Sequence, residues 1–302
     1  MASTKDTSVL ADWRSQPLVE ATPPRGLIAG TKYSINALIQ QKDLVRLLIQ
    51  REIKARYKDS ALGVVWSLFR PLVQLLIFYV AVGKFLGAER SIPEFAIFVF
   101  AGLTAWGLFY EVLQGATNSI VSNAGLIKKV YLPREIFPLA ATGSALFNFG
   151  VQFIVLLGAT IVLGRIPFTL DFFYAPLGAL LLLTFAFAIG LLFSAITVYL
   201  RDMQHLVEVL LLVLFWASPI VYSYSFVHKL LQGNWLEQIY LANPITIGIM
   251  GFQRGMWIAG TDQMWPADLA IRMGIMTVIC LALVWWSQRV FAKLEGNFAQ
   301  EI

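Results

Sequence analysis

The sequence predicts an all-α polytopic membrane protein with six transmembrane helices, an N-terminal amphipathic interfacial helix, and short re-entrant helices before the last span. Two observations carry this prediction. Of the 302 residues, 58% are hydrophobic and 14% are charged, whereas a soluble globular chain carries about 25% charged residues. The charges also cluster in the N-terminal stretch and in short connectors, with long uncharged runs between them. Polytopic helical membrane proteins distribute their charge in this way.

Residues 1–40 are predicted to be a polar cytoplasmic N-terminal tail. This stretch contains Pro17, Pro23 and Pro24. It has no basic region followed by an apolar core, so we expect no cleavable signal peptide. Insertion into the membrane must then be driven by the first span.

Residues 41–63 are predicted to form an amphipathic interfacial helix region, because Leu44, Leu47 and Leu48 alternate with several Lys and Arg residues. Such a helix cannot span a bilayer, but it can lie at the cytoplasmic interface with its cations toward lipid phosphates. The same basic residues would also orient the first span, and position alone does not separate the two readings. Further on, Pro71 fits the first turn of a helix. Arg70 must extend its charge to the membrane interface or pair with another polar group.

Six apolar stretches, which make up a transmembrane domain over residues 64–290, approach the roughly 20 residues that a bilayer core requires. They cover residues 64–82, 95–115, 137–163, 172–200, 206–222 and 269–286. A seventh stretch, 235–258, is interrupted at Asn243-Pro244, so we interpret it as two short re-entrant helices. Non-helical backbone at membrane depth is stable only where protein groups or water form hydrogen bonds with its N–H and C=O groups.

The basic residues predict the orientation. With the N-terminus inside, 17 of the 23 Lys and Arg residues fall on the cytoplasmic side. This positive-inside bias places both termini in the cytoplasm, including the C-terminal tail 291–302.

Two cytoplasmic connectors carry further information. In the connector 118–138, a short basic turn ends at Pro133; it could dock a soluble partner, although an ordinary loop is the simpler reading. In the next connector, Arg201-Asp202 is a charged pair at a tight turn, and Glu208 follows in the next helix. If Glu208 lies within the membrane, it is a candidate functional residue. The alternative is that Arg201, Asp202 and Glu208 form a structural charge cluster.

Polar residues within the spans are few. Asn148 and Gln152 are one turn apart in the third span, and we expect them to face the bundle interior, as a helix–helix hydrogen bond or as part of a polar lumen. Glu111 and Glu208 are the carboxylates that come close to the interior.

Several chemistries are not expected. The sequence contains no G-x-x-x-x-G-K-[ST] phosphate loop, and His205 and His228 are isolated. Cys280 is the single cysteine, which excludes an internal disulfide and a cysteine-rich metal cluster. We therefore predict no catalytic residue, no metal site and no cofactor in this chain. Any energy from ATP must come from another chain.

Five sequence segments resemble those of the permease subunits of type-2 ABC exporters for polysaccharides, such as O-antigen, capsule and teichoic-acid exporters. They are RYKDSALGVVWSLFRPL (56–72), LIKKVYLPREIFPL (126–139), YLRDMQHLVE (199–208), SPIVY (218–222) and ANPIT (242–246). The segments occur in the order of that family from about Asp43 onward. The first is very specific, while the last two alone would be weak.

This resemblance implies a homodimer in the bacterial plasma membrane with two copies of a separate ATPase, which binds ATP and Mg²⁺. The substrate would be a polyprenyl-diphosphate-linked glycan, and membrane lipid rather than nucleic acid would surround the chain. The matching positions imply a diphosphate gate and an ATPase coupling segment. The gate would comprise Arg56, Tyr57, Lys58 and Arg70. The coupling segment would comprise Leu126, Lys128, Lys129, Tyr131 and Arg134.

Other functions of a membrane protein predict features that this sequence lacks. A secondary transporter would show internal repeats and charged relay residues, and the sequence shows no convincing repeat. A membrane glycosyltransferase would carry a carboxylate cluster such as Asp-x-Asp, which is absent. A membrane enzyme or a scaffold of lipid-linked glycan biosynthesis remains the alternative to an exporter.

Overall fold

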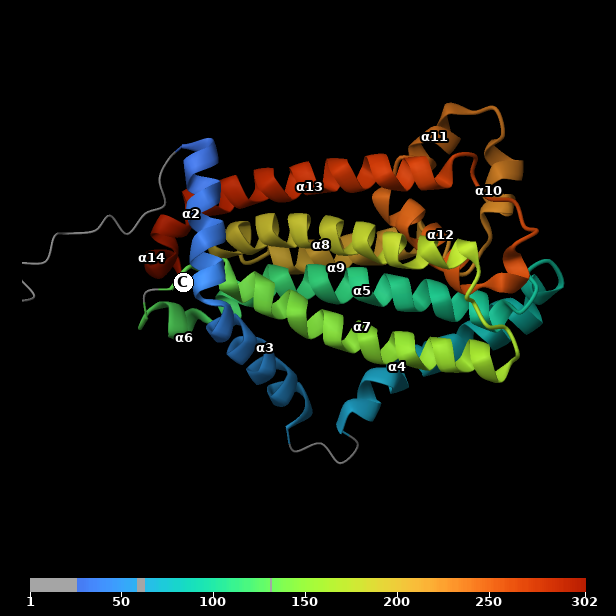
Figure 1. The fold of residues 1–302 in the computed structure, drawn as a ribbon, viewed down its shortest axis with the longest axis horizontal. Coiled ribbons are helices and arrows are strands. Elements are labelled where there is room, and N and C mark those ends of the chain that lie inside the picture. The colour runs from blue at the N-terminus through green and yellow to red at the C-terminus, as the bar shows by residue number, and fades with distance from the viewer. Residues whose placement is uncertain (1–25, 59–62, 131) are drawn as a thin grey trace, which may run out of the picture.

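The computed structural model describes residues 26–58, 63–130 and 132–302. Within these residues every regular element is a helix and no strand occurs, so the predicted all-α class is confirmed. Long helices run side by side along the longest axis of the molecule, and shorter helices lie at its two ends (Figure 1).

Five helical segments are long and apolar enough to cross a membrane within the described residues. They cover Trp66–Phe85, Phe95–Ser122, Ile136–Val162, Leu170–Tyr199 and Leu269–Asn297. In helix labels, the first combines α4 (Trp66–Phe78) with the π-helix η2 (Tyr79–Phe85), and the second and third are α5 (Phe95–Ser122) and α7 (Ile136–Val162). The fourth combines η4 (Leu170–Phe173) with α8 (Tyr174–Tyr199), and the last combines α13 (Leu269–Leu294) with η6 (Glu295–Asn297).

The sixth predicted span, residues 206–222, is not a full-length helix. Helix α9 covers Met203–Trp216 and stops there. Fourteen residues of helix measure about 21 Å, which is shorter than the roughly 30 Å core of a bilayer. The chain continues through Ser218–Tyr222 without regular structure, and the Nε2 amide of Gln253 donates to the carbonyl of Pro219 at 2.9 Å. Such bonds satisfy backbone that has left a helix.

The predicted interruption at Asn243-Pro244 is confirmed. Helix α11 covers Trp235–Leu241 and α12 covers Pro244–Met256, and the side chain of Asn243 caps α12 by accepting from the amide of Ile245 at 3.0 Å. Together with α10 (Tyr224–Leu231) these helices lie at one end of the bundle (Figure 1). Helix α12 is almost wholly buried against α8 and α5. Gly178 on α8 permits this contact, because a Cβ there would lie 2.5 Å from the carbonyl oxygen of Gly248.

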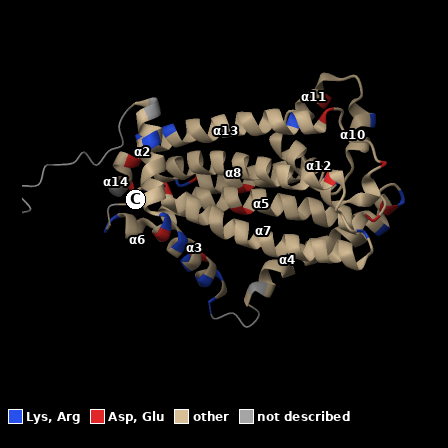
Figure 2. Ribbon diagram, viewed as in Figure 1, with Lys and Arg blue, Asp and Glu red and all other residues tan. Residues whose placement is uncertain are grey.

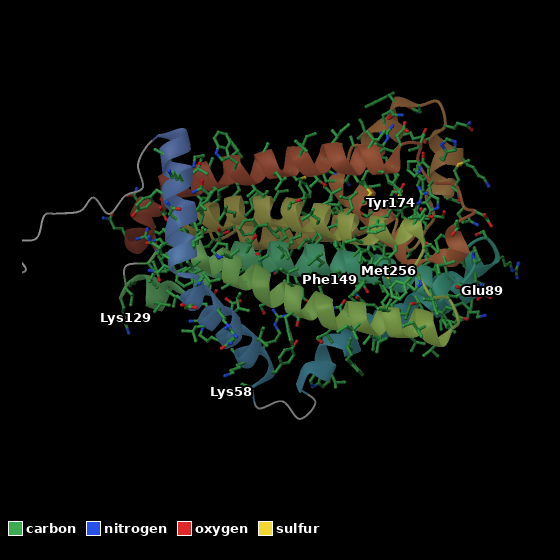
Figure 3. All side chains as sticks on the ribbon, viewed as in Figure 1. Lys58, Glu89, Lys129, Phe149, Tyr174 and Met256 are labelled. Carbon is green, nitrogen blue, oxygen red and sulfur yellow. The ribbon has the colours of Figure 1, made fainter. Side chains whose placement is uncertain are left out.

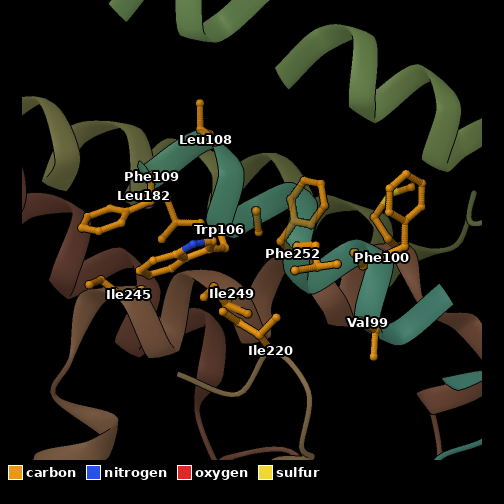
Figure 4. Packing of buried hydrophobic residues seen from close by; sticks show 14 of the residues in the cluster. Val99, Phe100, Trp106, Leu108, Phe109, Leu182, Ile220, Ile245, Ile249 and Phe252 are labelled. Carbon is orange, nitrogen blue, oxygen red and sulfur yellow. The ribbon is translucent and has the colours of Figure 1, made fainter. Parts of the chain in front are cut away.

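Helix α5 is the centre of the bundle. It packs on α7, α8, α9 and α12, and most of its side chains are buried. Its aromatic residues Trp106 and Phe109 lie among Leu182, Ile245 and Ile249 of α8 and α12 (Figure 4). By contrast, α4 packs weakly and exposes large apolar side chains. These include Trp66, Phe69, Leu72, Leu76 and Ile77.

The opposite end of the bundle is built from shorter helices and the C-terminal end of the chain. These elements are α2 (Leu27–Gln40), α3 (Lys42–Tyr57), α6 (Ala124–Ile127) and α14 (Phe298–Glu301). Residues 27–40, within the stretch expected as a tail, thus form a helix. It lies against α13, where the indole Nε1 of Trp285 donates to Thr31 Oγ1 at 3.1 Å. Lys and Arg are dense on α3 and sparse along the long helices (Figure 2).

Two sequence expectations change in detail. The helix predicted over residues 41–63 ends at Tyr57, and only one of its faces is buried, through Val45 and Leu48. Pro71 was expected in the first turn of a helix, which is wrong, because α4 begins at Trp66 and Pro71 lies inside it. Three further elements are the 3₁₀ turns η1 (Gly63–Val65), η3 (Ala88–Arg90) and η5 (Ile258–Gly260).

Candidate functional site

A cavity of about 340 Å³ lies where the end of α3 and the start of α4 face α5 and α7. Its lining residues come from all four helices. They are Arg56, Tyr57, Trp66, Ser67, Arg70, Pro71, Gln74, Leu103, Trp106, Gly107, Tyr110, Glu111, Asn148 and Gln152. Three of the four predicted gate residues, Arg56, Tyr57 and Arg70, therefore meet at one site.

The last turn of α3 is tied to the bundle by polar contacts. The Nη1 of Arg56 lies 2.9 Å from the Oε2 of Glu111 on α5. The hydroxyl of Tyr57 donates to the Oδ1 of Asn148 on α7 at 2.7 Å. Asn148 in turn donates from Nδ2 to the same Glu111 oxygen at 2.5 Å. One network thus joins α3, α5 and α7.

Helix α3 reaches this position because it packs closely on α7. Gly143 on α7 has no side chain, and a Cβ there would lie 2.4 Å from the Cδ1 of Ile49. The close approach directs the C-terminal turn of α3 toward the cavity. Asn123, at the end of α5, adds a second tie by accepting from the Nη2 of Arg51.

Arg70 and Lys58 differ in their surroundings. Arg70 lies with its Cζ 5.5 Å from the centroid of the Tyr110 ring, a cation–π contact, and within the described residues it forms no ion pair. Lys58 is exposed at the tip of α3 (Figure 3) and does not line the cavity. It lines a shallower surface hollow with Leu47 and Lys54.

The described lining of the cavity mixes apolar and polar side chains and carries a net positive charge. Among the lining residues that the structure describes, two guanidinium groups, of Arg56 and Arg70, accompany the single carboxylate of Glu111. The buried Oε1 of Gln152 has no hydrogen-bond partner in the described part of the chain. Guanidinium groups form charge-assisted hydrogen bonds with phosphate and carboxylate oxygens, so this arrangement is suited to holding an anionic group. The expectation that Asn148 and Gln152 face the interior is confirmed, since they are 1% and 4% exposed.

The predicted coupling residues lie at the bundle end that carries α2, α6 and α14. Leu126 belongs to α6, and Lys128 and Lys129 follow it with exposed side chains (Figure 3). Arg134 lies over the ring of Phe298. Tyr131 lies outside the residues that the structure describes. Lys128, Lys129 and Arg134 line a surface hollow of about 240 Å³ together with Ile127, Val130, Leu132 and Phe137, whereas Leu126 does not line it.

A buried carboxylate anchors this segment to the last span. Glu135 accepts from the Nε2 of Gln288 at 2.6 Å and is 6% exposed. Burial raises the pKa of the Glu135 carboxyl above its ordinary value, and the hydrogen bonds from Gln288 and Ser34 oppose that rise. The start of α7 is thereby fixed to α13 and α2.

The predicted charge cluster of Arg201, Asp202 and Glu208 is not assembled as one contact. Arg201 and Asp202 are exposed in the turn between α8 and α9. Glu208 is also exposed, and its carboxylate lies 3.7 Å from the Nδ1 of His205. Among the described residues, no ion pair joins Glu208 to the other two.

A second buried polar group lies at the end with α10 and α11. The carboxylate of Glu237 accepts from the hydroxyl of Tyr224 at 2.6 Å and contacts the Nδ1 of His228 at 2.6 Å. The hydrogen bond from Tyr224, followed by that from His228, lowers the pKa of the Glu237 carboxyl. This group ties α10 to α11.

Sequence reasoning did not assign a role to Glu111 or Phe298. Glu111 was noted only as a carboxylate near the interior, and its spacing from Arg56 gives no signal of a contact. Phe298 was included in a C-terminal tail, yet it is fully buried. Across the described ranges, no group of three or more His, Cys, Asp or Glu side chains is placed to hold a metal ion.

A family model described as ABC-2 type transporter matches residues 43–257 of this chain. The chain is 28% identical over 269 residues to the O-antigen export system permease protein RfbA of Myxococcus xanthus, which covers 89% of this chain and 98% of that protein. It is 26% identical to RfbA of Klebsiella pneumoniae over 89% of this chain and 97% of that protein. The capsule polysaccharide export inner-membrane protein CtrC of Neisseria meningitidis serogroup B is 28% identical over 75% of this chain and 83% of that protein.

Proposed function

Since this chain belongs to the ABC-2 type transporter family, we propose that it is the permease subunit of an ATP-driven exporter that moves a polyprenyl-diphosphate-linked polysaccharide outward across the bacterial plasma membrane. The observation that carries the proposal is the match to O-antigen export permeases over nearly their full length. A glycan of the O-antigen, cell-wall galactan or teichoic-acid type would fit. The chain is a transport subunit, with hydrolysis assigned to a separate ATPase.

The assembly contains two copies of this chain and two copies of the ATPase, which binds ATP and Mg²⁺. The apolar side chains that α4 exposes support a second copy or lipid as its neighbour. The sequence contains no phosphate loop, which supports a separate nucleotide-binding chain.

The diphosphate of the substrate binds in the cavity lined by the last turn of α3, the start of α4, α5 and α7. Arg56 and Arg70 supply charge-assisted hydrogen bonds, and Tyr57 supplies a hydroxyl. Lys58, at the exposed tip of α3, acts as an outer contact for the incoming anion. The support is that Arg56, Tyr57 and Arg70 line one cavity.

The segment that contains Leu126, Lys128, Lys129, Tyr131 and Arg134 transmits movement of the ATPase. Exposed cations on a segment anchored by Glu135 support this role. The proposal places this end, and both termini, in the cytoplasm, in agreement with the positive-inside bias and the dense cations of α3 (Figure 2).

Depletion of the chain in its native cell tests the proposal. Full-length polyprenyl-linked glycan should accumulate on the cytoplasmic face of the membrane. If glycan synthesis stopped early instead, the chain would be an enzyme or scaffold of biosynthesis. Unchanged amount and location of the glycan would contradict both functions.

A further inference from the structure

Glu111 has an unusual place in the cavity. A single carboxylate oxygen accepts from the Nη1 of Arg56 at 2.9 Å and from the Nδ2 of Asn148 at 2.5 Å. These donors come from α3 and α7, while Glu111 itself lies on α5. The side chain of Glu111 is 25% exposed and that of Arg56 is 45% exposed, so both groups are accessible from the cavity.

A second cavity adjoins the first at this ion pair. It has a volume of about 350 Å³ and lies between α3 and α5, toward the end with α6. Arg56 and Glu111 line both cavities. Asn118 lines the second cavity, and its buried side-chain oxygen has no hydrogen-bond partner among the residues that the structure describes. The ion pair therefore lies between two cavities.

Glu111 uses the same donors that a phosphate would use. Carboxylate and phosphate oxygens both accept charge-assisted hydrogen bonds from a guanidinium group. While Glu111 holds Arg56, the remaining full charge among the described lining residues is Arg70, which is covered on one side by Tyr110. We propose that Glu111 is a built-in competitor that occupies Arg56 in the empty cavity and that a diphosphate must displace. This inference rests on the proposed function. It assigns to Glu111 the selectivity of the cavity for diphosphates.

The competition separates diphosphates from ordinary phospholipids. A headgroup with one negative charge would exchange one anion for another at Arg56 and gain little. A diphosphate carries more charge and can contact Arg56 and Arg70 together, so it can displace the carboxylate. Glu111 thus keeps abundant monoanionic lipids out of the cavity.

Binding of farnesyl diphosphate to the full-length chain in lipid nanodiscs tests this inference. Trp66 and Trp106 line the cavity, so their fluorescence reports binding. The Glu111→Gln variant should bind about ten-fold more tightly than the wild type, equivalent to about 1.4 kcal/mol. It should also discriminate less against farnesyl monophosphate. In the Arg56→Ala background, Glu111→Gln should give no tightening.

The matched control is Glu89→Gln. Glu89 pairs with Lys84 at 2.8 Å at the opposite end of the bundle from Lys129 (Figure 3), so its loss should leave binding unchanged. Farnesol and inorganic pyrophosphate separate the contributions of the chain and of the anion. If Glu111→Gln does not yield folded protein, Glu111→Asp shortens the side chain and should tighten binding by a smaller factor.

Unchanged or weaker binding in the Glu111 variants would overturn the inference, as would tightening that persists without Arg56. The outcome is independent of the depletion experiment. If depletion traps glycan but Glu111→Gln does not bind farnesyl diphosphate more tightly, Glu111 is not a competitor and the exporter function stands. If Glu111→Gln binds farnesyl diphosphate more tightly but depletion does not trap glycan, the exporter function fails and the role of Glu111 as a competitor for anions stands.

Discussion

The guanidinium of Arg134 lies over the ring of Phe298, with 5.6 Å between its Cζ and the ring centroid. This contact joins the connector before α7 to the C-terminal helix α14. Phe298 also packs edge-on against Phe291 at 5.4 Å and is fully buried. The chain end is therefore part of the platform that carries the predicted coupling residues.

Replacing Phe298 with alanine should lower the free energy of unfolding by about 3 kcal/mol, because it removes a large buried ring. It should also weaken the stimulation of the partner ATPase, since Arg134 loses its support. Thermal unfolding and ATPase assays in nanodiscs measure the two effects. Phe226→Ala is the control, because that ring is 71% exposed. Equal behaviour of the two variants would contradict the platform.

Replacing Arg56 or Arg70 with alanine should reduce glycan export by about ten-fold or more, because a charge-assisted hydrogen bond contributes about 1.5–3 kcal/mol. Co-purification of the ATPase should be unaffected. Arg90→Ala is the control, because Arg90 is the exposed last residue of η3 and does not line the cavity. Normal export in both cavity variants would rule out the diphosphate site.

A double replacement of Lys128 and Lys129 by alanine should uncouple ATP hydrolysis from export. Both side chains are exposed beside α6 and make no intramolecular ion pair among the described residues, so the fold should tolerate the change. The ratio of ATP hydrolysed to glycan exported measures coupling. Lys293→Ala, which removes another exposed cation near the same end, serves as the control. An unchanged ratio would make the segment an ordinary connector.

The stability that Glu237 confers on the α10–α11 pair should depend on pH. The folded-state pKa of Glu237 lies below its ordinary value of 4.5. The contribution is therefore present above that value and is lost as the pH falls through the folded-state pKa. The difference in melting temperature between the wild type and Glu237→Gln should be largest near about pH 7 and vanish in acid.

The control for this pH series is Asp262→Asn, an exposed position in the turn after η5. It should melt like the wild type at every pH. A difference between the wild type and Glu237→Gln that stayed constant into acid would show that the carboxylate charge contributes nothing.

The helical class and most spans could be predicted because hydrophobicity over about 20 residues is a local signal. The break at Asn243-Pro244 was predictable for the same reason, since capping and proline effects are local. The early end of α9 was not predicted: residues 209–217 are continuously apolar, and Ser218-Pro219 near the end of the predicted span gave a helix-breaking signal that was not used. Just after the end of α9, the carbonyl of Pro219 accepts a hydrogen bond from Gln253 of α12, a residue distant in the sequence.

The candidate site was predicted in part. The basic residues at the end of α3 stood out as charges beside a span. Their partners Glu111 and Asn148 are 55 and 91 residues away from Arg56 and Tyr57 in the sequence, and only the packing of α3 on α7 brings them together. The burial of Phe298 was missed because the short C-terminal segment around it is polar.

Transport by inside-out membrane vesicles that contain this chain and its partner ATPase tests the central claim most directly. Addition of ATP should move polyprenyl-diphosphate-linked glycan into the vesicle lumen, where an added glycosidase cannot reach it. Vesicles with Arg56→Ala should show much less protected glycan. If the wild-type vesicles protect no more glycan with ATP than without it, the chain is not the export permease that we propose.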